Sequence, residues 1–324
     1  MAETFPHMKS KRLFTVIVLA LGLTLTGRAL QRVEQQSFTL PADGTVKVEA
    51  YRGLITVTTS PGDKVELKVR WVSSQDKAQA APVALDGLQL RMTQVGSTIS
   101  LIATNPRETG LSFDFGGRPQ LSIYCELVVP EHCNLDLTTG NGGIAVDSMS
   151  GRMQAKAVTG TISVRQIEGS ITARTEIGDI LVSRCTGEVN LQSVQGNLSV
   201  GTVGGRATLE TANGDIELMN AYGEVQAKAS SGNINAGFAR IIGPSSITSS
   251  LGNVTATINP AEKFSLDAQT RWEKIFSKLP LAAAKGGIGQ SRLIGDFQGG
   301  GPQLTLASGG GTLWIGSAAP LFAL

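Results

Sequence analysis

Residues 160–205 read GTISVRQIEGSITARTEIGDILVSRCTGEVNLQSVQGNLSVGTVGG, and their spacing sets the architecture of this chain. A glycine recurs at every ninth residue, and a short alternation of apolar and polar residues follows it. The same spacing continues outward in both directions, so that eleven glycines lie at intervals of nine between Gly142 and Gly232. An α-helix cannot hold this pattern, because nine residues make about two and a half turns and would scatter the apolar positions.

The repeat unit contains a strand pattern and a turn pattern. With glycine as position 1, positions 3 and 5 are apolar in all eleven units, position 4 is polar in nine, and position 8 is apolar in nine. Alternation at positions 3 to 5 is typical of a strand with one buried face, and glycine followed by a polar residue is typical of a turn. A strand and a turn at a fixed short period predict a solenoid. We expect positions 3, 5 and 8 of every unit to point inward.

Alternate units differ at position 2, which predicts a rung of about 18 residues in which two units make one coil and rungs stack about 4.8 Å apart. An Asn/Asp column at one corner is compatible with calcium or sugar binding. The favoured interpretation is structural, because Asn and Asp tolerate turn geometry and hydrogen-bond to the backbone. The units also lack the Gly-Gly-x-Gly-x-Asp motif of calcium-binding nonapeptides. One set has Gly143, Thr161, Asp179, Asn197, Asp215, Asn233 and, after a two-residue insertion, Asn253, whereas the other has Arg152, Ser170, Glu188, Arg206 and Glu224.

The unit pattern also occurs outside the regular repeat. Residues 53–57, 252–256 and 311–315 fit it, and residues 45–49 and 65–69 alternate as strands. The segment 104–120 is expected to be an exposed loop, and residues 272–278 are expected to contain a short helix before Pro280.

The N-terminus has the layout of a secretory signal peptide. Lys9, Lys11 and Arg12 precede an uncharged 15-residue run, LFTVIVLALGLTLTG at residues 13–27, which ends in small residues near Ala29. Cleavage near Ala29 is favoured, and an uncleaved membrane anchor is the alternative. We therefore divide the chain into a signal peptide or anchor (1–29), an N-terminal β region (30–135), the regular β-solenoid (136–258) and an irregular segment with closing strands (259–324).

Composition excludes several classes of function. Of 324 residues, 41% are hydrophobic, 39 are Gly and only two are His, His7 and His132, which argues against His-pair metal sites and Ser-His-Asp triads. Without residues 1–29 the net charge is −1, from 24 basic and 25 acidic residues. No basic stripe remains for nucleic acid and no polybasic patch for anionic lipid. A membrane contact is expected only through the N-terminal apolar segment.

Three cysteines remain after export, Cys125, Cys133 and Cys185. An odd number does not make a disulfide framework. A turn could bring Cys125 and Cys133 together as a disulfide, and small buried thiols are the favoured alternative. Their spacing with Glu131 and His132 does not match a zinc site.

Outward positions of the repeat contain no pair of carboxylates on neighbouring rungs, as glycoside hydrolysis by acid–base chemistry would require. Arg174, Glu210 and Lys228 share one face, which is the ordinary state of a solvated sheet. We predict no catalytic, cofactor-binding or metal-ligating residues and no cofactor. The main enzymatic alternative is a carbohydrate-active β-helix enzyme, a polysaccharide lyase or hydrolase.

The order of motifs resembles that of the bacterial "putative adhesin" family, exported envelope proteins that carry a domain of unknown function. The resemblance rests on the leader, an introductory Leu-Val-Val-Pro at 127–130, the Gly-polar-Ile-x-Val repeat, and a closing GGGPQLTL at 299–306 before the last strand at 311–315. It covers residues 38–316. The resemblance implies an all-β fold, a single-stranded parallel β-helix (β-solenoid), and it carries no assigned catalytic residues.

These observations predict a non-enzymatic scaffold or adhesion-like binding module of the cell envelope, outside the cytoplasm, whose partner is an unknown envelope polymer or protein. A partner protein in envelope-stress regulation is a further alternative. Long polar faces predict binding that is spread over many weak contacts. The outward residues Arg174, Gln192, Glu210 and Lys228 are expected to contribute little each.

Overall fold

The computed structural model describes residues 31–73, 89–104, 121–280, 282–286 and 290–317. Throughout these residues the chain forms strands and turns, with no helix. In particular, the described part holds no helix long and apolar enough to cross a membrane. The predicted leader and the predicted loop from residue 105 onward lie outside the described residues.

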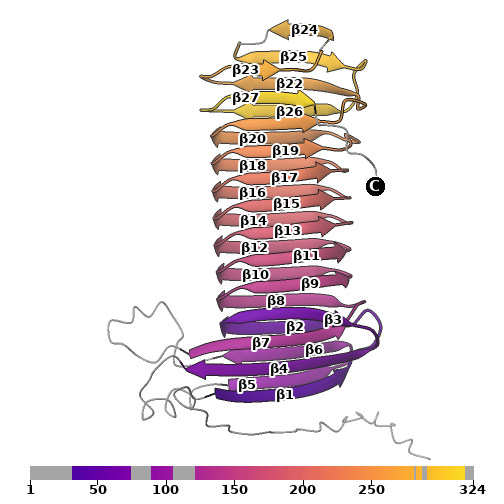
Figure 1. Ribbon diagram of the computed structural model, residues 1–324, viewed down its shortest axis with the longest axis vertical. Coiled ribbons are helices and arrows are strands. Elements are labelled where there is room, and N and C mark those ends of the chain that lie inside the picture. Colours follow the sequence, from indigo (N-terminus) through magenta and orange to yellow (C-terminus); the bar gives the residue numbers. More distant parts are fainter. Residues whose placement is uncertain (1–30, 74–88, 105–120, 281, 287–289, 318–324) are drawn as a thin grey trace, which may run out of the picture.

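The strands stack into an elongated body with the N-terminal strands at one end and the C-terminal strands at the other (Figure 1). They form two sheets, sheet A of 13 strands and sheet B of 14 strands. In spatial order, sheet A consists of β1 (Gln31–Thr39), β4 (Lys64–Ser73), β7 (Leu121–Pro130), β3 (Leu54–Ser60), β9 (Ile144–Ser150), β11 (Ile162–Glu168), β13 (Ile180–Cys185), β15 (Leu198–Val203), β17 (Ile216–Ala221), β19 (Ile234–Phe238), β21 (Val254–Ile258), β27 (Leu313–Ser317) and β23 (Ile275–Ser277). Sheet B consists of β24 (Ala282–Gly286), β25 (Arg292–Phe297), β22 (Phe264–Thr270), β26 (Gln303–Ser308), β20 (Ser245–Leu251), β18 (Val225–Ser231), β16 (Ala207–Asn213), β14 (Val189–Gln195), β12 (Ile171–Ile177), β10 (Met153–Thr159), β8 (Asn134–Asn141), β2 (Thr45–Arg52), β6 (Thr98–Thr104) and β5 (Gln89–Val95).

The strand register confirms the predicted rung of 18 residues. Ile162 pairs in parallel with Ile180, Ile180 with Leu198, and Leu198 with Ile216, each 18 residues further along the chain. Each rung therefore contributes one strand to each sheet. The two-residue insertion follows β19, where Ile234 pairs with Val254. The fold is the predicted all-β parallel solenoid.

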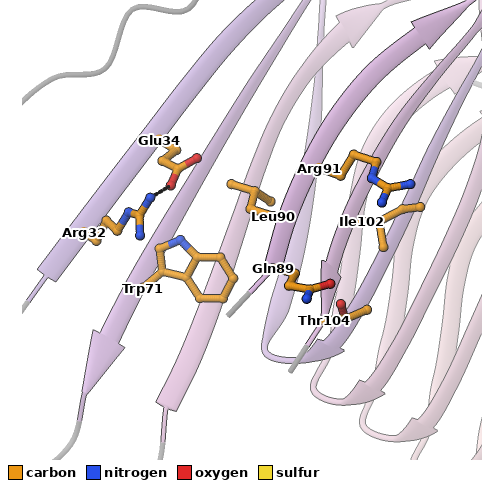
Figure 2. Close-up of a pocket in the computed structure, with 8 residues that line it drawn as sticks. All are labelled: Arg32, Glu34, Trp71, Gln89, Leu90, Arg91, Ile102 and Thr104. Atoms are coloured by element: carbon orange, nitrogen blue, oxygen red, sulfur yellow. Dashed lines mark ion pairs between the residues drawn. The ribbon is translucent and has the colours of Figure 1, made fainter. Parts of the chain in front are cut away.

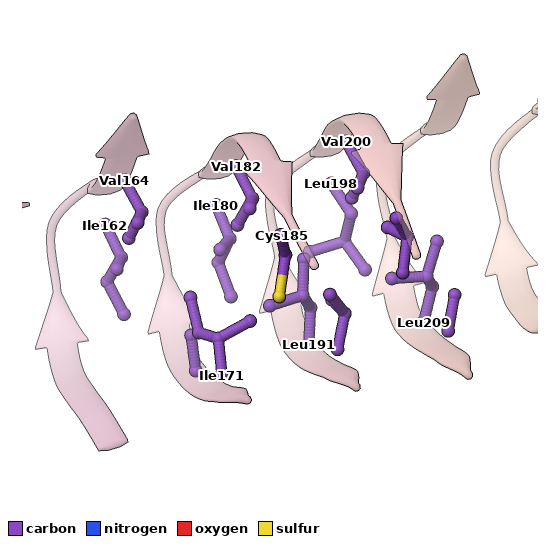
Figure 3. Close-up of a cluster of buried hydrophobic side chains, with 14 of the residues drawn as sticks. Ile162, Val164, Ile171, Ile180, Val182, Cys185, Leu191, Leu198, Val200 and Leu209 are labelled. Carbon is purple, nitrogen blue, oxygen red and sulfur yellow. The ribbon is translucent and has the colours of Figure 1, made fainter. Parts of the chain in front are cut away.

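The core lies between the two sheets. All 22 residues at positions 3 and 5 of the eleven units are buried, as the alternation predicts. Figure 3 shows these side chains converging from successive rungs, with Ile162, Ile180 and Leu198 on one side and Ile171 and Leu191 on the other. Burying a Val, Leu or Ile side chain contributes about 1.5–3 kcal/mol, so a long stack of such pairs stabilises the rod.

The prediction that position 8 points inward in every unit is wrong for half of them. In sheet A, position 8 is buried, as at Ile167, Cys185 and Val203. In sheet B the same position is exposed, as at Val158 (41%) and Val194 (44%). The sheet A strands bend, so that two successive residues such as Arg165 and Gln166 point away from the core before the next inward residue. The sheet B strands alternate without a break, so position 7 is buried instead, as in β12.

Inward hydroxyls lie at the corners of most sheet B strands, in a column that alanine interrupts on β10 and β18. The Thr175 hydroxyl donates to the Gly160 carbonyl (3.3 Å), and those of Ser193 and Thr211 donate to the next two corner glycines at 3.0 Å each. Glycine is required at these corners. A Cβ on Gly178, whose φ is 148°, would lie 2.2 Å from the Gly160 carbonyl oxygen.

Both ends depart from the regular winding. At the N-terminal end β2 and β3 form a rung beside β8 and β9, and β6 and β7 form the next one out. Antiparallel strands then close this end, with β5 on β6 and β4 between β7 and β1. These antiparallel pairs cover strand edges that a bare solenoid would expose.

At the C-terminal end the strands do not stack in the order of the sequence. β26 and β27 pair with β20 and β21, while the earlier strands β22 and β23 lie outside them. The predicted short helix at residues 272–278 is wrong, because residues 275–277 form β23 on the edge of β27. Pairing with a strand that is distant in sequence overrides the local helical preference.

Candidate functional site

The outer face of sheet B carries two parallel rows of outward side chains along the regular part of the stack. We call the first the charged row and the second the polar row. The charged row consists of Lys156, Arg174, Gln192, Glu210 and Lys228, each paired in register with the next. The polar row consists of Gln154, Thr172, Asn190, Thr208 and Gln226, also in register. Successive members lie one strand spacing apart, about 4.8 Å.

This arrangement confirms that Arg174, Glu210 and Lys228 share a face. Lys228 and Glu210 form a loose ion pair of 3.7 Å on neighbouring strands. Lys156 and Arg174 are adjacent and exposed, and neither forms an ion pair with a described residue. The charged row thus runs from two free cations to one weak pair, and exposed pairs of this kind contribute about 0–1 kcal/mol.

Near the N-terminal end of the same face, Lys47 and Glu49 form an ion pair of 2.8 Å. The hydrogen bond to Glu49 raises the pKa of Lys47 above its usual value. Lys47 therefore stays charged over the physiological range, and the pair is part of the solvated surface.

The Asn/Asp corner column is a backbone support, as predicted. The side-chain oxygen of Asp179 accepts the Asn197 N–H (2.7 Å), and that of Asn197 accepts the Asp215 N–H (2.8 Å). The pattern continues through Asn233 and Asn253 to the Thr312 N–H at 2.9 Å. Because each side chain bonds the rung that follows, the column aligns successive corners. Among the described residues no cluster of three or more His, Cys, Asp or Glu could hold a metal ion.

The cysteines are buried free thiols, so the disulfide alternative for Cys125 and Cys133 is not adopted. Burial raises the pKa of Cys125 to about 12 and that of Cys133 to about 11. Burial also raises the pKa of Cys185, whose Sγ donates to the Gly169 carbonyl at 3.1 Å. All three remain protonated at neutral pH, and a protonated buried thiol is a poor nucleophile.

A pocket of about 580 Å³ opens at the N-terminal end, between β1 and β4 on one side and β5 and β6 on the other (Figure 2). Its base is the Trp71 indole, which is buried and whose Nε1 has no hydrogen-bond partner among the described residues. The rim holds the Arg32–Glu34 ion pair (2.5 Å) and Arg91. The lining residues are Arg32, Glu34, Trp71, Gln89, Leu90, Arg91, Ile102 and Thr104.

The end pocket offers hydrogen-bonding and charged groups, but its lining contains a single carboxylate, Glu34. Acid–base hydrolysis of a glycoside needs two carboxylates flanking the bond. The pocket can hold a small polar molecule without supplying that chemistry. Sequence reasoning missed it because four strands, joined by antiparallel pairing at one end, bring its residues together.

The fold and surface define a parallel β-solenoid with long polar outer faces. Residues 188–286, which include β14 to β24, match the family model Toastrack DUF4097, a domain of unknown function. Over this segment the match agrees with the domain of unknown function that the resemblance implied. No curated protein matches the chain.

Several solved structures are similar to the chain. One is a putative adhesin from Bacteroides fragilis, with 13% identity, TM-score 0.39, and coverage of 89% of this chain and 97% of that one. Another is a putative lipid binding protein from Parabacteroides distasonis, with 15% identity, TM-score 0.41, and coverage of 89% and 97%. A putative cell adhesion protein from Clostridium sporogenes has 9% identity, TM-score 0.23, and coverage of 89% and 100%.

Proposed function

We propose that this protein is a non-enzymatic, adhesion-like binding module of the cell envelope that holds an extended polymer or protein along the outer face of sheet B. The observation that carries the proposal is the continuity of the charged and polar rows over five successive strands of one flat face. Such a face repeats the same hydrogen-bonding groups at a fixed spacing, which suits a partner that is itself extended.

The predicted N-terminal leader supports the same proposal. The basic start and apolar run of residues 1–29 would place the β-domain outside the cytoplasm, either released or anchored. A fusion of residues 1–35 to a reporter that is active only in the periplasm tests this, and activity is expected. A fusion that stays in the cytoplasm contradicts export. The division of the chain at residues 29, 135 and 258 remains a prediction.

Co-sedimentation of the full-length protein with purified bacterial cell-wall sacculi tests the binding face. Single alanine changes at Arg174, Gln192, Glu210 or Lys228 should each weaken binding by about 1 kcal/mol or less, because each contact is exposed. The fourfold variant should lose most of the binding. A matched variant of outward sheet A residues, Ser163→Ala with Ser199→Ala, should retain it.

Three outcomes contradict the proposal. Loss of all binding from one of these single changes, with the fold intact, would indicate a discrete site. Turnover in a panel of soluble polysaccharides would indicate the carbohydrate-active enzyme instead. If neither the native protein nor the fourfold variant sediments with sacculi, the sheet B face does not bind this polymer and the proposal fails for it.

A further inference from the structure

Exposed tryptophan occurs only at the C-terminal end of the described stack. Trp71 is buried, whereas Trp314 is 46% exposed and Trp272 is 78% exposed. Trp314 lies on β27 and points outward from sheet A, on the side of the molecule opposite the charged row. Tryptophan and tyrosine side chains are enriched where proteins bind partners.

The Trp314 indole stacks on the Phe276 ring of the neighbouring strand β23. Their ring centroids are 4.5 Å apart and their planes differ by 17°. This separation is close to the spacing between strands, about 4.8 Å, so the rings stack along the direction in which strands follow one another. Phe276 covers one face of the indole. The other face is turned toward β21, where Thr255 is the residue paired with Trp314.

Two lysines flank this aromatic pair. Lys274 and Lys278 lie two residues before and after Phe276, and both are exposed. β27 fixes their backbone, because Lys278 N–H donates to the Ile315 carbonyl at 2.9 Å and the Lys274 carbonyl accepts the Leu313 N–H at 3.2 Å. Neither lysine forms an ion pair with a described residue. We call Phe276, Trp314, Lys274 and Lys278 the aromatic platform.

The surface beside the free indole face is small and polar. Thr255 is half-buried, and Asn235, its partner on β19, is exposed. A flat ligand ring resting on Trp314 would therefore lie over a hydroxyl and an amide. The platform combines an apolar ring face, neutral hydrogen-bonding groups and unpaired positive charge within a few residues.

We propose that the aromatic platform binds an acidic saccharide, with one sugar ring stacked on Trp314 and the carboxylates of the chain paired with Lys274 and Lys278. The C–H groups of a sugar ring carry partial positive charge and pack against the negative face of an aromatic ring. Carboxylates form charge-assisted hydrogen bonds with ammonium groups. This site lies on the opposite sheet from the face used in the proposed function, so each can fail without the other.

A uronic acid oligosaccharide distinguishes this chemistry from simple aromatic stacking. Isothermal titration of the full-length protein should show binding of an oligogalacturonate and weaker binding of a neutral maltooligosaccharide of the same length. The preference for the acidic chain should fall as salt is raised, because the lysines are exposed. Equal binding of the two saccharides at low salt would contradict the role of the lysines.

Two variants separate the two contacts. Trp314→Ala should weaken oligogalacturonate binding by about tenfold, as expected for an aromatic anchor. Lys274→Gln combined with Lys278→Gln should remove the preference for the acidic saccharide while neutral binding persists. Tyr222→Ala, an exposed aromatic elsewhere, and Arg184→Gln, an exposed cation on β13, should bind like the native protein.

Trp314→Leu serves if Trp314→Ala fails to fold, because leucine keeps the site apolar and removes the ring. Unchanged affinity in a folded Trp314 variant overturns the proposal. So does the absence of oligogalacturonate binding. Binding of the native protein to anionic phospholipid vesicles, lost in the Trp314 variant and without any saccharide binding, would assign the platform to a membrane surface and also overturn it.

Discussion

The two sheets are built from the same nine-residue motif, yet they finish their strands differently. A sheet A strand such as β11 buries Ile162 and Val164, bends, and then buries Ile167. A sheet B strand such as β12 buries Ile171, Ala173 and then the hydroxyl residue Thr175 without a bend. The motif therefore sets the first two inward residues, and the path of the chain sets the third.

The two sheets also differ in the inward side chain that lies next to the corner. The Thr175 side chain lies where a corner carbonyl, that of Gly160, points toward the interior, and it donates a hydrogen bond to it. In sheet A the equivalent inward position is taken by apolar side chains such as Ile167 and Val203. A buried polar group without a partner costs about 1–3 kcal/mol, so a small hydroxyl residue at the sheet B position stabilises the corner.

The largest effect should come from placing a charge on the inward side of a rung. Ile180→Asp should destabilise the protein by about 3–5 kcal/mol, because the carboxylate would be buried and unpaired. The adjacent Leu181, 41% exposed, provides the control, since Leu181→Asp should change stability by less than about 0.5 kcal/mol. Chemical denaturation measures both. Equal effects would mean that the alternation of inward and outward residues is wrong.

A change at position 8 tests the difference between the sheets directly. Val203 in sheet A is fully buried, so Val203→Ser should cost about 2–3 kcal/mol from lost burial and packing. Val194 holds the same repeat position in sheet B but is 44% exposed. Val194→Ser should cost less than about 0.5 kcal/mol. Denaturation midpoints that shift equally would contradict the bend in the sheet A strands.

Substitution of a corner glycine should come next. Gly178→Ala should cost about 1–3 kcal/mol, because the residue has positive φ and its new Cβ would contact the Gly160 carbonyl. A Cβ on Gly316 would have no neighbour within 4 Å, and Gly316→Ala should leave the thermal midpoint unchanged. A Gly178→Ala protein as stable as the native one would contradict the close approach of successive corners.

The smallest effect should follow loss of one inward hydroxyl. Thr175→Val keeps the shape of the side chain and removes its hydrogen bond to Gly160, which should cost about 1 kcal/mol. Thr172 on the same strand points outward, so Thr172→Val is the matched control and should be neutral in the same denaturation experiment. If Thr175→Val is as stable as the native protein, the hydroxyl column does not support the corners.

The regular solenoid was predictable because its information is local and repeated. The glycine spacing, the inward positions 3 and 5 and the Asn/Asp column follow from residues within one or two rungs of each other, and the register of β11 and β13 confirms them. The outward placement of Arg174 and Glu210 followed from the same alternation of inward and outward residues. The helix expected at residues 272–278 failed because β27, far along the chain, pairs with that segment.

The order of residues is enough to predict the rung, because two apolar positions in every nine residues recur on the inward face of successive stacked strands. The direction in which position 8 faces depends on the folded chain. A bend in the strand exchanges the inward and outward directions for every residue that follows it. The same holds for the strands that close the ends, and thereby for the side chains that meet there. The Trp71 pocket and the Phe276–Trp314 stack each join residues from strands that are distant in sequence. Such pairings depend on antiparallel turns of the chain and on strands that insert out of sequence order. No local pattern of apolar and polar residues encodes either feature.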